Sequence, residues 1–500
     1  MGNCIITRRG LPSEASVKQE GIYPIGADGR PMGNVIVPDT VTRLYQYIFW
    51  KDTNVWSIAL PNLLLSVDIR SFAECSSLTS INIPNTLEEL PDYCFANCAE
   101  LRTVDISAES SCTSIGEQAF YGCSSLKNFI FPYGLRWIGI QAFYDCKSLT
   151  EIHLPSTIDC ITKQAFYNCQ AVREIILSPK IVSIADGGFQ YNYYTQRICT
   201  HDAIDSEYAL MLPSVLTSLG ANAFEGCFSH VVMGAKIFLH QALESIGNAC
   251  FKQCSNLSHV DIEDGANLKI GNNAFENCTM LDDESVYNIT SHSNTIGTYT
   301  FSKCNKLQNV NTKMLSSYMF SGCASLESIT GTNICNESGS YIIQTCSNLK
   351  SVILKSAGIN ISDNAFRGCT SLETLKINGT SMSMGKSVFY GDTGLKNLYL
   401  PSTIVSCTSN SLTSTSSSYY FLYGCTNLEN VILGVGWSVS VRLDASSNLT
   451  HDSMLETINN LANLNELGKS SQTLTIGSVN KTKLSADEIA IATSKGWSVT

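Results

Sequence analysis

A phenylalanine followed three residues later by a cysteine recurs along most of this 500-residue chain, at intervals close to 23 residues. The pairs that define the repeat are Phe72 with Cys75, Phe95 with Cys98, Phe120 with Cys123, Phe143 with Cys146, Phe166 with Cys169, and Phe366 with Cys369. Degenerate copies carry Asp52 or Asp392 at the cysteine position and Ile343 or Leu422 at the aromatic position. Together they make about 16 units of roughly 23 residues between residues 35 and 435. A fixed period of this length predicts a solenoid, in which each unit forms one coil.

The unit that begins at Phe143 shows how a coil is built. After the phenylalanine come Cys146, Leu149, Ile152, Leu154 and Pro155. The alternation of Ile152 and Leu154 before a proline predicts a short strand with its apolar side turned inward. The remaining apolar positions form a second wall, so each coil closes around a narrow core. One coil alone buries too little surface to be stable, and we expect stability to come from stacking.

This pattern resembles the BspA-like subfamily of leucine-rich repeats, whose unit reads I-x-x-x-A-F-x-x-C-x-x-L-x-x-I-x-I-P. The matching residues in one unit are Ile138, Ala142, Phe143, Cys146, Leu149, Ile152, Leu154 and Pro155. The resemblance covers about four fifths of the chain. It implies a repeat solenoid with short β-strands in each coil.

The repeat divides the chain into three predicted parts. Residues 1–34 lie outside the repeat and are interpreted as an attachment or capping segment, and residues 35–445 form the solenoid. In residues 446–500 the pattern changes to helical spacing, then a strand over 473–476, then a helix begun by Ser485 with Glu488 three residues later, which is a capping box. We expect this last part to be a small α/β cap, because the end of a solenoid needs a different outer face.

Two stretches lengthen the repeat, near residues 190–212 and 402–420. Insertions in solenoids map to loops on one side, which is often the binding side. The aromatic and basic residues that we assign to these candidate binding loops are Tyr191, Tyr193, Tyr194, Arg197, Tyr419 and Tyr420.

Three further tyrosines, Tyr121, Tyr144 and Tyr167, each follow a repeat phenylalanine at intervals of one coil. If they face outward, they form a ladder of aromatic rings with hydroxyl tips, which suits sugar rings or a protein partner. Packing against the neighbouring coil is the alternative interpretation, and the sequence leaves both open.

The cysteine positions and the net charge argue against a disulfide framework, a zinc site and nucleic-acid binding. Thirteen of the 21 cysteines occupy the repeat position, where they are expected to be reduced and buried as small apolar side chains rather than joined in disulfides. Cys94 and Cys98, like Cys250 and Cys254, are four residues apart, which is not the spacing of a zinc site. The net charge of −11 argues against broad electrostatic binding of nucleic acid.

We find no signal for catalysis, a cofactor or a metal. The glycine-rich stretch around Gly385 has the wrong spacing for a phosphate-binding loop, and the seven histidines show no acidic partner at a fixed spacing. The first residues show no apolar stretch of the length expected for a secretory leader, and no later apolar run is long enough to span a membrane. We therefore expect the protein to be soluble, without membrane insertion, and unexported by ordinary routes.

The final residues, from Thr473 to Trp497, resemble the C-terminal segment of BspA-like proteins encoded by phages and prophages. Together with the BspA-like solenoid and the lack of an export signal, this resemblance implies a non-enzymatic recognition protein on a phage tail or virion. Such a protein would bind a protein or glycan on a host cell and contact other tail proteins through residues 1–34. The alternative is a cellular BspA-like surface adhesion or interaction protein of a bacterium or unicellular eukaryote. The sequence does not decide between them, and self-association into a homo-oligomer also stays open.

Overall fold

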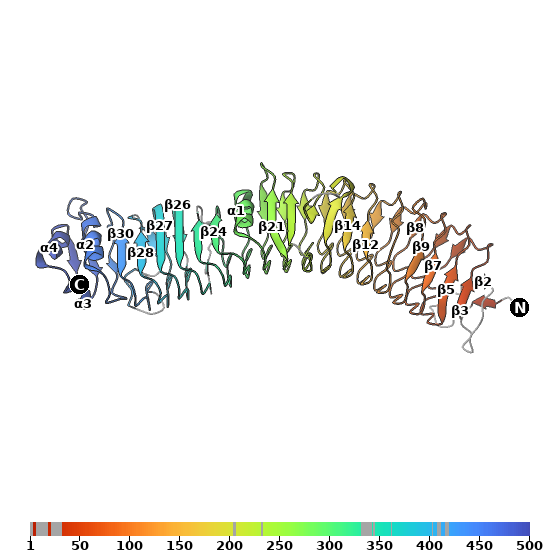
Figure 1. Cartoon of the computed structure of the whole chain (residues 1–500), viewed down its shortest axis with the longest axis horizontal. Coiled ribbons are helices and arrows are strands. Elements are labelled where there is room, and N and C mark those ends of the chain that lie inside the picture. The colour runs from red at the N-terminus through yellow and green to blue at the C-terminus, as the bar shows by residue number, and fades with distance from the viewer. Residues whose placement is uncertain are drawn as a thin grey trace. The chain divides into compact units, whose positions relative to one another are not determined.

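The computed structural model describes residues 4–6, 19–21, 33–203, 207–231, 234–331, 343, 346–361, 363–402, 404–407, 412–415 and 420–500. The chain divides into two compact units, Met1–Leu268 and Lys269–Thr500. In each unit, successive coils stack so that strands from neighbouring coils pair in parallel (Figure 1). The predicted repeat solenoid is therefore confirmed, whereas the predicted domain boundaries at residues 34 and 445 stay a prediction.

The first unit carries one series of strands just after the cysteine position. Its members are β3 (Gly33–Ile36), β5 (Val55–Ala59), β7 (Ser80–Asn82) and β9 (Thr103–Asp105), followed by a second sheet of β12 (Glu151–His153), β14 (Glu174–Leu177), β16 (Arg197–Thr200), β17 (Leu210–Met211), β19 (Ala235–Leu239) and β21 (Leu257–Ile262). In β12, Ile152 is buried and its neighbours in the strand are exposed, as the alternation predicted. Separately, β1 (Cys4–Ile6) pairs antiparallel with β2 (Gln19–Gly21).

A second series of very short strands lies five residues before each phenylalanine and forms the opposite wall. The strands of this series in the first unit are β4 (Arg43–Leu44), β6 (Ser66–Val67), β8 (Glu89–Leu90), β10 (Ser114–Ile115), β11 (Trp137–Ile138), β13 (Cys160–Ile161), β15 (Ser183–Ile184), β18 (Ser218–Leu219) and β20 (Ser245–Ile246). Residues at equivalent positions face each other across coils, for example Ile115 and Ile138. The register is therefore set by the 23-residue period itself.

The second unit repeats this plan with longer strands. Its main sheet runs in the order β24 (Asn309–Thr312), β25 (Ser328–Gly331), β26 (Ser351–Ile361), β27 (Thr374–Met384), β28 (Asn397–Leu400) and β30 (Asn430–Leu433), with β29 (Ile404–Cys407) also paired to β27. Two short strands, β22 (Leu268–Ile270) and β23 (Ser293–Ile296), lie near its start.

One coil of the second unit contains a helix that the repeat did not predict. After Phe275, α1 (Asp283–Ser291) occupies the place where other coils have a strand. The Asp282 carboxylate accepts hydrogen bonds from the backbone N–H and hydroxyl of Ser285, which caps the first turn. Val286 and Ile289, three residues apart, are buried on the same helix face. An N-cap with apolar residues at helical spacing was therefore the signal in the sequence, overlooked because the repeat continues on both sides.

The phenylalanines form a column of stacked rings inside each unit. From Phe49 to Phe251, consecutive ring centroids are 5.1–5.8 Å apart and the ring planes are nearly parallel. In the second unit, Phe275, Phe301 and Phe320 stack at 5.8 and 5.9 Å. These rings have almost no exposed surface. Burial of so large a side chain in most coils accounts for much of the hydrophobic stabilisation of the stack.

The thiols at the repeat cysteine position lie beside this column, where they are buried and not joined in disulfides. The Sγ of Cys146 lies 3.3 Å from the carbonyl oxygen of Phe120, and the Sγ of Cys169 lies 3.2 Å from that of Phe143. The same contact joins Cys323 to Phe301 in the second unit. Each thiol thus donates a weak hydrogen bond to the main chain of the preceding coil. Cysteine therefore fills the core and also satisfies a buried carbonyl group.

The chain turns sharply on both sides of each phenylalanine. Two residues before it and two residues after it, the backbone adopts positive φ, as at Gln141 (55°) and Asp145 (60°) around Phe143. Glycine and asparagine often fill the second of these positions, as at Gly122 and Asn168, since they tolerate this conformation best. The paired turns direct Phe143 inward and leave Tyr144 half-buried at the surface.

The C-terminal residues fold as predicted from their spacing. They comprise β31 (Val441–Arg442), α2 (His451–Asn460), β32 (Gln472–Thr475), α3 (Ser478–Lys481), α4 (Ala486–Ser494) and β33 (Trp497–Val499). The capping box at the start of α4 is confirmed, because the Ser485 hydroxyl accepts from the Glu488 N–H while the Glu488 carboxylate accepts from the Ser485 N–H. Helices α2 and α4 pack together beside this small sheet (Figure 1).

Candidate functional site: a tyrosine strip

Outward tyrosines gather on one side of the first unit. The rings of Tyr121 and Tyr144 stack with centroids 4.8 Å apart, and those of Tyr144 and Tyr167 stack at 4.3 Å. All three side chains are half-buried. Their spacing is that of neighbouring coils, so the solenoid itself positions the rings.

The stack continues beyond Tyr167 with residues from a different position of the next coil. Tyr191 meets the edge of Tyr167 at 5.3 Å, and Tyr193 stacks on Tyr191 at 5.7 Å. Gly226 lies against both rings, and a β-carbon there would approach the Tyr193 ring to 2.9 Å. We call Tyr121, Tyr144, Tyr167, Tyr191 and Tyr193 the tyrosine strip. The absence of a side chain at Gly226 makes room for the end of this strip.

Tyr194 adds an exposed aromatic group next to the tyrosine strip. The residue is 47% exposed, and its ring stacks on the imidazole of His230 with centroids 4.3 Å apart. The Nδ1 of His230 lies 3.3 Å from the Tyr193 carbonyl oxygen, which helps to hold the imidazole in place. An exposed aromatic side chain that is already ordered is well suited to binding, because little conformational freedom is lost on contact.

A row of glutamines accompanies the three stacked tyrosines. The Gln118 side-chain amide donates to Gln141 at 2.8 Å, and the Gln141 amide donates to Gln164 at 2.7 Å. These residues recur at 23-residue intervals in the sequence, so their spacing was a readable signal that we missed. The glutamine row fixes the polar border of the tyrosine strip.

The ring geometry changes what the strip can bind. Stacked rings cover each other's faces, so the strip presents ring edges and hydroxyl groups rather than free aromatic faces. Burial and the neighbouring Tyr144 hydroxyl raise the pKa of Tyr121 and of Tyr167 above the usual tyrosine value. Both hydroxyls therefore stay neutral at physiological pH and can both donate and accept hydrogen bonds.

The first insertion lies later in the chain than the sequence suggested. Tyr191, Tyr193 and Tyr194 belong to the regular turn after Phe189, and Arg197 begins β16, so none of these four residues is in the inserted loop. The extra residues follow β16, where the chain forms a short 3-10 helix (His201–Ala203) and returns as β17. The prediction that these four residues lie in the inserted loop was wrong. The longer spacing between two repeat phenylalanines shows how many residues are inserted, but not at which point of the coil the insertion begins.

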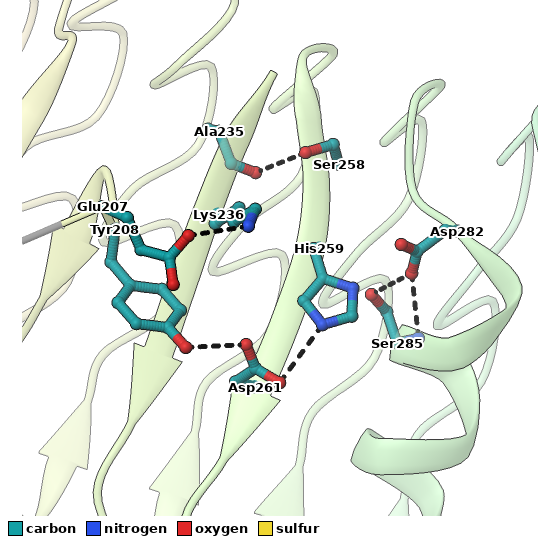
Figure 2. A network of polar contacts seen from close by, with 9 residues as sticks. All are labelled: Glu207, Tyr208, Ala235, Lys236, Ser258, His259, Asp261, Asp282 and Ser285. Atoms are coloured by element: carbon teal, nitrogen blue, oxygen red, sulfur yellow. Dashed lines mark hydrogen bonds and ion pairs between the residues drawn. The ribbon is translucent and has the colours of Figure 1, made fainter. Parts of the chain in front are cut away.

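Polar contacts fasten the end of this insertion to the sheet of the first unit. Figure 2 shows Glu207 paired with Lys236 at 2.9 Å, and the Tyr208 hydroxyl donating to Asp261 at 2.9 Å. The other oxygen of Asp261 lies 3.1 Å from His259 Nε2. The same figure shows the Asp282 cap of α1 in the second unit. The insertion is thus partly a structural element that packs on the sheet.

Several histidines have acidic partners that the sequence analysis missed. His240 Nδ1 lies 3.3 Å from the Glu263 carboxylate, which is 23 residues further on, and His153 lies 3.6 Å from Glu174. These partners are about one coil apart, which is the spacing that a solenoid requires for contact. In the described part of the chain, no group of three or more histidine, cysteine or acidic side chains is arranged to hold a metal ion.

The second insertion offers less to a ligand than expected. Tyr420 is almost fully buried, and its hydroxyl lies 3.3 Å from the Arg442 carbonyl oxygen. Burial raises its pKa well above the usual value. Tyr420 is therefore a core residue, and its assignment to a binding loop was wrong because the coil resumes at Phe421. Tyr419 lies outside the described residues.

In the residues that the structure describes, no helix has the length and apolar character needed to cross a membrane.

Comparison with solved structures supports the fold. A leucine-rich repeat protein from Bacteroides ovatus is 22% identical, with a TM-score of 0.55, over 80% of this chain and 94% of that one. Less similar are a leucine-rich repeat protein of T. pallidum, 19% identical over 42% of this chain and 87% of that one with a TM-score of 0.29, and a leucine-rich cell surface protein of Faecalibacterium prausnitzii, 19% identical over 71% and 92% with a TM-score of 0.36. No curated protein matches significantly.

The family model described as a BspA type leucine-rich repeat region matches in six copies, over residues 29–110, 104–207, 208–313 and 296–419. These matches span most of the chain and coincide with the coils that carry the phenylalanine column and the cysteine thiols. The chain belongs to the BspA-type leucine-rich repeat family.

Proposed function

We propose that this protein is a non-enzymatic recognition protein, and that the tyrosine strip with Tyr194 is its binding surface. The observation that carries the proposal is the gathering of six tyrosines on neighbouring coils of one unit, held in order by stacking and by the glutamine row. Tyrosine is enriched in binding interfaces because it combines a large apolar area with a polar tip and few rotatable bonds.

A protein partner suits this surface better than a glycan. Sugar rings bind aromatic side chains by packing on a ring face, and in the tyrosine strip most faces are covered by the next ring. Ring edges and neutral hydroxyls instead match the mixed apolar and hydrogen-bonding character of a protein surface. A glycan partner remains the alternative, and Tyr194 is the residue with the most exposed ring for it.

The test is binding of the purified, fluorescently labelled protein to a panel of intact bacterial cells. The double substitution Tyr144→Ser and Tyr167→Ser removes the centre of the strip and is expected to reduce the bound fraction at least tenfold. Protease treatment of the cells should abolish binding, whereas periodate oxidation of surface sugars should leave it. Loss of binding after periodate alone would identify a glycan partner and contradict the protein assignment.

A matched control comes from the second unit, where Tyr299 and Tyr318 stack at 4.5 Å in a similar pair. Substituting both with serine should leave binding unchanged, and thermal unfolding should confirm that both double variants are folded. Equal loss of binding in the two variants would show that the strip of the first unit is not special. If the wild-type protein binds no cells, the recognition proposal itself fails.

We further propose that the protein is a component of a phage tail or virion, and that residues 1–34 attach it to other tail proteins. This proposal is supported by the resemblance of the residues from Thr473 to Trp497 to phage-encoded BspA-like proteins. Mass spectrometry of purified virions should then detect the protein at a fixed ratio to known tail proteins. Its absence from virions, together with its release by proteases from intact producing cells, would favour the cell-surface alternative.

A further inference from the structure

Three coils replace the buried cysteine with a polar residue, namely Asp52, Asn192 and Asp392, and the last two of these coils carry a long insertion. Asn192 occupies the cysteine position in the coil that continues into the insertion after β16, and Asp392 occupies it in the coil that continues into the stretch near 402–420. Neither side chain has exposed surface. A polar group so placed needs a hydrogen-bond partner.

One polar atom of each side chain, the Oδ1 oxygen, has a hydrogen-bond partner in the preceding coil. The Oδ1 of Asn192 accepts from the Cys169 N–H at 2.8 Å, and the Oδ1 of Asp392 accepts from the Cys369 N–H at 2.9 Å. The other atom of each side chain, Nδ2 of Asn192 and Oδ2 of Asp392, has no partner among the described residues. The two side chains thus sit in the same environment in different units.

This environment suits a neutral side chain. The titratable groups that face Asp392 are the buried thiols of Cys369 from the coil before and Cys425 from the coil after, and neither carries a positive charge. A carboxylate would therefore be buried without a counter-ion, which is very unfavourable. A protonated carboxyl group, by contrast, has the shape of the asparagine amide that the first unit uses at this position.

We propose that Asp392 is a neutral carboxylic acid in the folded protein, and that its ionisation loosens the coil that carries the second insertion. This makes the stability of the coil depend on pH in the physiological range. The same burial raises the pKa of Asp392 to about 8. The inference does not depend on the tyrosine strip or on any binding partner.

The direction of the effect follows from the proton balance. When the coil opens, Asp392 meets water and its pKa falls to about 4, the ordinary value for aspartate. Between these two pKa values the closed coil holds a proton that the open coil releases, so closure weakens as pH rises. The contribution of Asp392 to the stability of the closed coil is full below about pH 4. It falls through the neutral range and reaches its lower limit above about pH 8.

Hydrogen exchange of the full-length protein tests the proposal at the Cys369 amide, which donates to Asp392. After correction for the intrinsic rate, the wild-type protection factor should fall between pH 5.5 and 7.5 by up to about tenfold per pH unit. Asp392→Asn should keep a constant protection factor over this range. The converse substitution, Asn192→Asp, should transfer the pH dependence to the Cys169 amide in the other unit.

A control variant is Asp105→Asn, at an exposed position of β9, which should leave both pH profiles unchanged. An unchanged wild-type protection factor, or the same fall in Asp392→Asn as in wild type, would overturn the proposal. If Asp392→Asn does not fold, the Asn192→Asp variant provides the test. A protection factor of the Cys169 amide that does not change with pH in that variant would equally contradict the proposal.

Discussion

At the scale of single residues, the cysteine position shows why composition alone is a poor guide to chemistry. A thiol such as that of Cys146 fills a small apolar space and donates to the Phe120 carbonyl oxygen of the preceding coil. Burial raises the pKa of this thiol well above its usual value, so almost no reactive thiolate forms. The abundance of cysteine therefore reflects the geometry of the coil.

Burial predicts a specific pattern of alkylation. Peptide-level labelling of the native protein with iodoacetamide at pH 8 should modify Cys160, which is partly exposed, and spare the buried Cys146 and Cys169. All three should react after unfolding in urea. Rapid native labelling of Cys146, or its recovery in a disulfide, would contradict the assignment of a free buried thiol.

The phenylalanine column predicts a large stability effect. Replacing Phe143 with Ala removes a buried ring that stacks on Phe120 and Phe166, at 5.1 and 5.4 Å. The free energy of unfolding should fall by about 3–5 kcal/mol, measured by urea denaturation. Phe143→Leu keeps most of the volume and should lose considerably less. A loss below about 1 kcal/mol for the alanine variant would contradict the role of this column.

The sequence predicted these buried residues because each is repeated many times. It could not predict the end of the tyrosine strip, because Tyr191 and Tyr193 occupy other positions of the coil than Tyr167. Tyr191 contacts the Tyr167 ring directly, and Gly226 of the following coil leaves room for the two later rings. Contacts between different positions of neighbouring coils follow from the geometry of the turns, which the period alone does not specify.

At the scale of elements, local capping signals act independently of the repeat. The capping box of α4 was readable in Ser485 and Glu488, and the structure confirms it. The cap of α1 at Asp282 is equally local, but a strong period on both sides concealed it. A search for caps inside every coil would have found this helix.

The capping box predicts a moderate effect of one hydroxyl group. Ser485→Ala leaves the Glu488 N–H without its side-chain acceptor and should lower the free energy of unfolding by about 0.5–2 kcal/mol. Thermal unfolding monitored by circular dichroism gives the measurement. Ser485→Asp, which keeps an acceptor at the N-cap, should remain close to wild type, and an equally destabilised aspartate variant would argue against capping as the cause.

At the scale of the whole molecule, two surface positions of the coil complement each other in size in several coils, although the coil of Phe49 carries large rings at both, Tyr47 and Trp50. Where a tyrosine directly follows the repeat phenylalanine, as Tyr144 follows Phe143, the residue two before the phenylalanine is a slimmer one, Gln141. Where that earlier position carries a tyrosine, as at Tyr318, the later one is a small residue, Ser321. The aromatic rings thus move between two neighbouring columns within each unit. The period predicted the scaffold, but such surface variation had to be seen in the structure.

We propose that the phenylalanines and cysteines form the scaffold, whereas the outward tyrosines bind the partner. Phe143 and Tyr144 are adjacent in the chain, one fully buried and the other half-buried at the surface. The most direct test is the cell-bound fraction of Tyr144→Ser and of Phe143→Leu, each divided by the folded fraction. We predict that binding per folded molecule falls severalfold for Tyr144→Ser and stays near wild type for Phe143→Leu. Undiminished binding by the tyrosine variant would contradict the account.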